Sequence, residues 1–130
     1  MAGSVEQARM KYAWRWVKDN DSPAAREARV RAIKGLGVML RNQGVLVVLA
    51  TLCKDGKTKP VADMLARWLL IDSPLALAEE DPFEGSPVKN LVERLAQVPR
   101  PQYQAAQAEA LALAEILKIY IETWDLKDGQ

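Results

Sequence analysis

The 130-residue sequence contains no histidine, one cysteine and one phenylalanine. Without histidine the chain lacks the commonest general base and the commonest metal ligand, and it cannot build a serine or cysteine triad of the usual kind. The single Cys53 cannot form an internal disulfide, which fits a reducing cytoplasm and predicts a small core residue. Because no run of eighteen apolar residues and no apolar signal core occur, we expect a soluble protein without a membrane or secretory address.

Two further kinds of site are also missing from the sequence. Gly35 and Gly37 lie in a helical pattern and follow no strand, so they do not form a phosphate-binding loop. Four carboxylates cluster in a proline-punctuated stretch: Glu79, Glu80, Asp81 and Glu84. They lack the alternating spacing that wraps calcium, and an acidic loop is more often simply solvated. We therefore expect no metal, no cofactor and no enzymatic activity, with carboxylate or lysine chemistry left as a formal alternative.

Charge is present in quantity but is unevenly distributed. Residues 1–71 carry thirteen Lys and Arg against six Asp and Glu, whereas residues 72–130 carry five against eleven. The basic half can hold a polyanion, or it can meet the acidic half of another copy in a head-to-tail contact that propagates as an open filament. The alternative is that both halves are solvated helix faces.

The apolar periodicity predicts an all-α fold, a compact single-domain bundle of about six helices joined by short turns. Ser22-Pro23 and Ser86-Pro87 each combine an N-cap hydroxyl with proline at the first helical position. The run at 44–52 is apolar on every face and is compatible with a strand, but a lone strand has no partner, so we expect a short central helix. The expected helices begin near residues 5, 23, 44, 58, 87 and 101, with an acidic loop at about 72–85.

Apolar stripes predict which face of each helix is buried. The expected stripe of the first helix is Val5, Tyr12, Ala13, Trp16 and Val17, and that of the second is Ala25, Ala32, Leu36, Met39 and Leu40. The last helix follows spacings of three and four: Tyr103, Ala106, Ala110, Leu113, Leu117, Tyr120 and Trp124. Gly35 and Gly37 predict a kink, or the close approach of another backbone, in the second helix.

The faces opposite these stripes carry the candidate phosphate ligands. On the first helix they are Lys11, Arg15 and Lys18, and on the second Arg26, Arg31, Lys34 and Arg41. Lys54 and Lys57 add charge in the turn before the fourth helix. A solvated face, or a face that docks a neighbouring subunit, would look the same in sequence. Trp14 is the most exposed aromatic by helical position, and we expect it to anchor a subunit interface rather than stack on a base.

Three segments resemble one known family. Residues 36–45, continuing into 49–54, are similar to a family core. That core reads Leu-Pro, Met-Ile, Asn-Gly-Leu and Leu-Ala-Phe before a lysine-containing turn. In this chain Gly37 replaces the proline and Thr51 replaces the aromatic residue. Residues 61–69 resemble its Trp-Leu helix, and residues 103–118 resemble its final helix. By these segments and their order, the chain is identified as a member of the small-subunit family of the type III-B CRISPR effector, the Cmr complex.

The resemblance implies a small helical subunit without catalytic activity. Members stack head-to-tail as a minor filament inside an RNA-guided ribonucleoprotein of antiviral defence, with other protein subunits, guide RNA and target RNA as partners. It implies that basic surface contacts the RNA backbone. From the uneven charge and the helical position we expect Glu79, Glu80, Asp81 and Glu84, with Trp14, at subunit contacts. An alternative function is a helical adaptor that binds a protein partner through an apolar face and has no role with nucleic acid.

Overall fold

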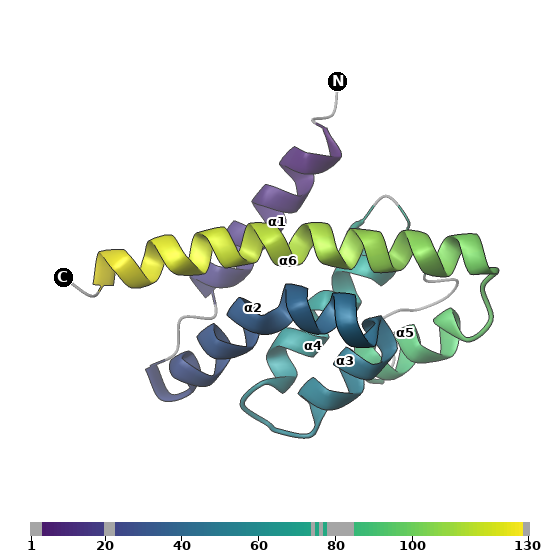
Figure 1. Ribbon diagram of the computed structural model, residues 1–130, viewed down its shortest axis with the longest axis horizontal. Coiled ribbons are helices and arrows are strands. Elements are labelled where there is room, and N and C mark those ends of the chain that lie inside the picture. The colour runs from purple at the N-terminus through teal and green to yellow at the C-terminus, as the bar shows by residue number, and fades with distance from the viewer. Residues whose placement is uncertain (1–3, 20–22, 74, 76, 78–84, 129–130) are drawn as a thin grey trace.

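A computed structural model describes residues 4–19, 23–73, 75, 77 and 85–128, without the side chains of residues 23–25 and 124–128. Over these residues the chain forms α-helices and one short π-helix, and no strand (Figure 1). The elements are α1 (Val5–Asp19), α2 (Pro23–Gln43), α3 (Val45–Cys53), α4 (Lys59–Arg67), η1 (Trp68–Asp72), α5 (Pro87–Leu95) and α6 (Arg100–Asp128). The predicted all-α bundle is confirmed.

The local start signals act as expected where the structure describes them. Ser86 caps α5, because its hydroxyl oxygen accepts a hydrogen bond from the backbone N–H of Lys89 at 3.3 Å, and Pro87 begins the helix. The apolar run at 44–52 is the helix α3 rather than a strand. One feature was not predicted: α4 widens into the π-helix η1, whose final turn places the N–H of Ser73 2.7 Å from the carbonyl oxygen of Trp68.

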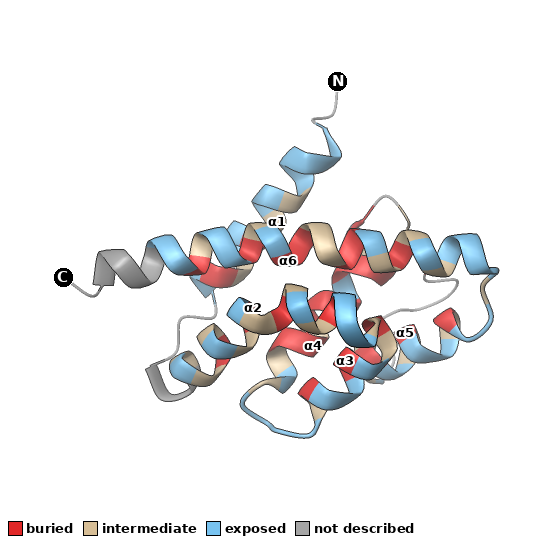
Figure 2. Ribbon diagram, in the orientation of Figure 1, coloured by how far each residue is buried: buried red, intermediate tan, exposed pale blue. Residues whose placement is uncertain are grey.

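Helix α6 is the longest element, with 29 residues, and it organises the fold. Both α1 and α2 pack chiefly against it, while α3, α4 and α5 pack in sequence beneath. In Figure 1, α1 crosses α6 steeply and its first turns project beyond it. Those turns are exposed, and burial begins further along the helix (Figure 2). Val5 is 40 % exposed, so its predicted place in the buried stripe is wrong: it precedes the crossing with α6.

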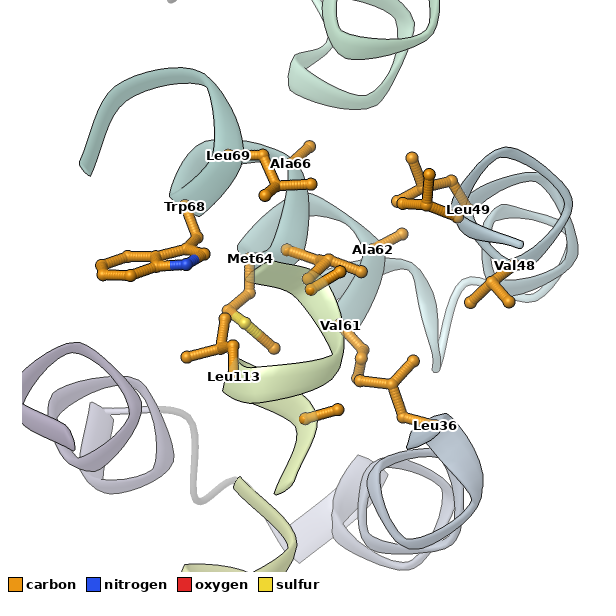
Figure 3. Close-up of a cluster of buried hydrophobic side chains, with 14 of the residues drawn as sticks. Leu36, Val48, Leu49, Val61, Ala62, Met64, Ala66, Trp68, Leu69 and Leu113 are labelled. Carbon is orange, nitrogen blue, oxygen red and sulfur yellow. The ribbon is translucent and has the colours of Figure 1, made fainter. Parts of the chain in front are cut away.

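A single apolar cluster fills the space between the helices. In Figure 3, Leu113 of α6 lies beside Met64 of α4, with Leu36 of α2 on the other side of the cluster. Trp68 is 1 % exposed and is the largest fully buried side chain. The α6 stripe is confirmed from Ala106 to Leu117, and the side chains of Ala25 and Trp124 lie outside the described residues.

The junction between α2 and α3 depends on one glutamine of α6. Gly44 has φ +85°, a conformation that side-chain-bearing residues rarely adopt, and it lets α3 begin immediately after α2 ends. Gln107 bridges the two helices at this point. Its carbonyl oxygen accepts from the N–H of Val45 at 2.8 Å, and its amide nitrogen donates to the carbonyl oxygen of Leu40. One side chain therefore satisfies backbone groups at both helix ends.

The expectation of a close backbone at the α2 glycines is wrong. Helix α2 runs unbroken through Gly35 and Gly37, and within 4 Å of a Cβ on Gly35 there would be no atom outside its own helix. A Cβ on Gly37 would lie 3.3 Å from a carboxylate oxygen of Glu115, which is a side chain rather than a backbone. Gly37 thus makes room for the ion pair between Glu115 and Arg41.

This difference predicts opposite outcomes for two similar substitutions. Gly35→Ala should stabilise the protein by about 0.4–1 kcal/mol, because alanine restricts the unfolded chain and meets open space in the helix. Gly37→Ala should gain less or lose stability, since the new methyl displaces the Glu115 carboxylate from its place beside α2. Urea unfolding of the two variants measures this. Equal gains at both positions would contradict the role given to Gly37.

The predicted loop at 72–85 lies mostly outside the described residues, but its beginning is attached to the bundle. Leu77 is buried, and its N–H donates to the carbonyl oxygen of Leu69 at 3.2 Å. Arg94 of α5 donates from Nε to the carbonyl oxygen of Leu77 at 2.8 Å. Leu77 is therefore held between η1 and α5 before the acidic stretch begins.

Candidate nucleic-acid interface

The basic face of α1 is displayed to solvent. Lys11, Arg15 and Lys18 are all exposed, and in the described part of the chain none of them pairs with a carboxylate. The opposite side of the helix is fixed in the bundle, because Ala13 and Val17 are buried against α6. The three cations recur at spacings of four and three, so they form one continuous strip. We call Lys11, Arg15 and Lys18 the α1 basic strip.

A buried polar cluster holds α1 in this orientation. The guanidinium of Arg9 donates from Nε and from a terminal nitrogen to the two carboxylate oxygens of Glu109, the latter bond being 2.9 Å long. The indole Nε1 of Trp68 donates to the same carboxylate at 3.0 Å. The Glu109 side chain is 8 % exposed and that of Arg9 is 22 % exposed. Hydrogen bonding to Glu109 raises the pKa of Arg9, so its guanidinium stays charged.

The sequence analysis missed this cluster, although a signal for it was present. Arg9 lies four residues before Ala13 and eight before Val17, on the buried stripe of α1. Glu109 lies beside Ala110 and three residues after Ala106, on the buried stripe of α6. A charge on each of two stripes that face the same core indicates a pair, because an isolated buried charge is costly.

Tyr12 provides a second attachment of α1. Its hydroxyl donates to the carbonyl oxygen of Met64 at 2.8 Å, and its ring lies 4.8 Å from that of Trp68. Burial raises the pKa of the Tyr12 hydroxyl, which therefore remains a neutral donor. Together with Arg9, this bond sets the rotation of α1 about its axis and turns the α1 basic strip outward.

Two of the candidate cations of α2 differ from the α1 basic strip because they pair with carboxylates. Arg31 pairs with Glu27 at 3.0 Å one turn away, and Arg41 pairs with Glu115 of α6 at 2.7 Å. Arg26 is half-buried, and Lys34 is exposed. Arg29, which was not a candidate, is buried at 7 % exposure. The predicted α2 ridge is therefore partly neutralised within the protein, and α1 and α2 each pack mainly on α6 rather than on each other.

The turn between α3 and α4 is ordered by short hydrogen bonds. The carboxylate of Asp55 accepts from the N–H of Lys57 at 2.9 Å, and the hydroxyl of Thr58 donates to the carbonyl oxygen of Leu52 at 2.6 Å. Lys54 and Lys57 are both exposed there. Burial raises the pKa of the neighbouring Cys53 thiol, which keeps it protonated and a poor nucleophile.

Trp14 lies on α1 beside the basic strip and is 45 % exposed. Its ring meets that of Tyr120 edge to face, with centroids 5.5 Å apart and planes at 70°. Tyr120 also lines an open groove of about 370 Å³ between α1 and α6. The groove is lined by Glu6, Arg9, Met10, Ile116, Ile119 and Tyr120. The remaining interface candidates, Glu79, Glu80, Asp81 and Glu84, lie outside the described residues.

Among the described residues, no group of three or more His, Cys, Asp or Glu side chains is placed to hold a metal ion. None of the described helices is long and apolar enough to cross a bilayer. What the structure offers is surface: a basic strip, an exposed tryptophan and an apolar groove, all involving α1.

Comparison with known proteins assigns the chain to a family. A family model described as CRISPR-associated protein (Cas_Cmr5) matches residues 5–123. The chain belongs to the Cmr5 family. The match begins at the first residue of α1 and ends within α6, so it spans all the helices of the bundle. Searches of curated proteins and of solved structures found no match.

Membership confirms the family inferred from the sequence. Cmr5 proteins are small structural subunits of the type III-B CRISPR effector, which is a complex of several proteins. The Cmr5 assignment therefore implies protein partners.

Proposed function

We propose that this Cmr5-family chain is a non-catalytic subunit that stacks head-to-tail as a minor filament in a type III-B effector and supports guide RNA–target RNA binding. It acts in the cytoplasm in antiviral defence. In such a machine base pairing reads the sequence, so a supporting subunit needs only positive charge and shape. The proposal rests chiefly on the α1 basic strip, whose three cations are exposed and lack carboxylate partners among the described residues.

The α2 arginines contribute less to this role. A phosphate that binds Arg31 or Arg41 must compete with Glu27 or Glu115, and the net gain falls accordingly. The order of importance is therefore the α1 basic strip first, the turn lysines Lys54 and Lys57 second, and the α2 cations last. The acidic residues 79–84 are proposed to meet the basic half of the next copy in the filament.

The test removes the same amount of charge from two places. Lys11→Gln, Arg15→Gln and Lys18→Gln are combined in one variant, and the exposed Lys89, Arg100 and Lys118 of the acidic half are replaced by glutamine in a matched control. Target-RNA affinity of the assembled complex is measured at several salt concentrations. The first variant should bind every target sequence more weakly, with a salt slope reduced by about 0.7–0.9 for each lost phosphate contact.

The control variant should keep the wild-type slope. A first variant that assembles correctly and keeps both wild-type affinity and wild-type slope would show that the α1 basic strip is a solvated face. The turn lysines Lys54 and Lys57 would then be the next residues to replace.

The adaptor hypothesis is favoured by one observation, the apolar groove between α1 and α6. An apolar contact depends weakly on salt, whereas phosphate contacts weaken steeply as salt rises through counterion release. The same salt series therefore separates the two functions.

A further inference from the structure

One exposed face of α1 combines an aromatic ring with positive charge. On a helix, residues three and four apart are neighbours on the surface. Trp14 therefore has Lys11 on one side and Lys18 on the other, and Arg15 follows it in the chain. All four side chains are exposed, and the two lysines are separated by about 10 Å along the helix axis. Tryptophan is enriched among the surface residues that contribute most to binding a partner.

The ring is held in place from within the molecule. Tyr120 of α6 meets it edge to face at 5.5 Å, so the indole is positioned before any partner arrives. It still exposes 45 % of its surface. A ring that is ordered in advance loses little conformational entropy when it binds.

We propose that Trp14 is a stacking platform for an unpaired RNA base, with Lys11 and Lys18 binding the phosphates on either side of that base. The occupant is single-stranded RNA or an unpaired nucleotide at a strand end, because a base within a duplex has no open face for the indole. The cations that flank Trp14 favour a polyanionic strand over an apolar protein segment. The inference rests on the proposed RNA contact of α1 and adds to it a contact with a base.

Stacking and charge have different experimental signatures, which the isolated full-length chain can reveal. The probes are a ten-nucleotide oligouridylate and an abasic phosphodiester strand of the same length. Trp14→Leu keeps an apolar side chain but removes the aromatic face. It should weaken oligouridylate binding by about 5- to 100-fold with an unchanged salt slope. The Trp14→Leu variant should bind the abasic strand with the same affinity as the wild type.

Three further variants complete the test. Trp14→Phe should recover most of the oligouridylate affinity, because a phenyl ring also stacks. Lys11→Gln with Lys18→Gln should lower the salt slope on both strands by about 0.7 for each lost contact. Val47 of α3 is an apolar residue exposed to a similar extent, and Val47→Ala should leave the affinity for both strands unchanged. The thermal midpoint of each variant checks that α1 remains docked on α6.

Two results would overturn the inference. One is a folded Trp14→Leu variant that binds oligouridylate as the wild type does, which would make Trp14 a protein contact, as the sequence suggested. The other is no oligouridylate binding by the wild type at low salt. Neither result decides the proposed function, because that is measured by lysine and arginine variants in the assembled complex.

Discussion

Replacing Glu109 with alanine is expected to lower the free energy of unfolding by about 2–4 kcal/mol. The substitution removes the partner of a partly buried guanidinium and also leaves the buried indole N–H of Trp68 without its acceptor. The indole N–H would then carry the full cost of a buried donor without a partner, while water would reach the guanidinium in part. Urea unfolding followed by circular dichroism measures the loss.

A second glutamate of the same helix provides the control. Glu115 also forms an ion pair with an arginine, but its side chain is 52 % exposed and that of Arg41 is 58 % exposed. Glu115→Ala should therefore cost about 1 kcal/mol or less, because water replaces the lost partner. Similar losses for the two variants would mean that the Arg9–Glu109 pair is no better insulated from water than a surface pair. Glu109→Ala should also loosen α1, and with it the α1 basic strip.

Truncating Leu113 to alanine is expected to cost about 2–5 kcal/mol. Leu113 is fully buried where α6 faces α4, beside Met64 in Figure 3. Shortening it leaves a cavity in the layer that joins the long helix to the rest of the bundle, and the surrounding backbone can collapse only in part. The thermal midpoint should fall by about 4 °C for each kcal/mol lost.

Ile119 of the same helix is the matched control, since it is 60 % exposed. Ile119→Ala should change the stability of the isolated chain by no more than about 0.5 kcal/mol. Comparable losses at Leu113 and Ile119 would contradict the packing described here, whereas a loss at Leu113 alone supports a core that is continuous along α6.

The sequence by itself determined the helices and their approximate ends. Apolar residues recur with the helical period, and a serine followed by proline supplies both a capping oxygen and a preset backbone angle at Ser86-Pro87. It also determined that α3 is a helix, since no second strand was available to pair with it. These are local properties, so a single chain segment contains enough information to predict them.

Only the tertiary structure decided which charges pair with one another. Arg9 lies on the apolar stripe of α1 and Arg15 does not, but the sequence does not show that Arg9 pairs with Glu109 while Arg15 has no carboxylate partner among the described residues. Periodicity shows which face of a helix is apolar, but it does not show what lies across from that face. Arg9 and Glu109 are 100 residues apart, and Arg41 and Glu115 are 74 apart.

The same reason explains the other differences. Val5 has the periodicity of a buried residue, but α6 passes too far along α1 to cover it. Gly37 is read in sequence as a weak point of a helix, whereas in the fold its missing side chain leaves space for the carboxylate of Glu115. Burial and ion pairing depend on where helices cross, and the crossing point is set by the packing of all the helices together.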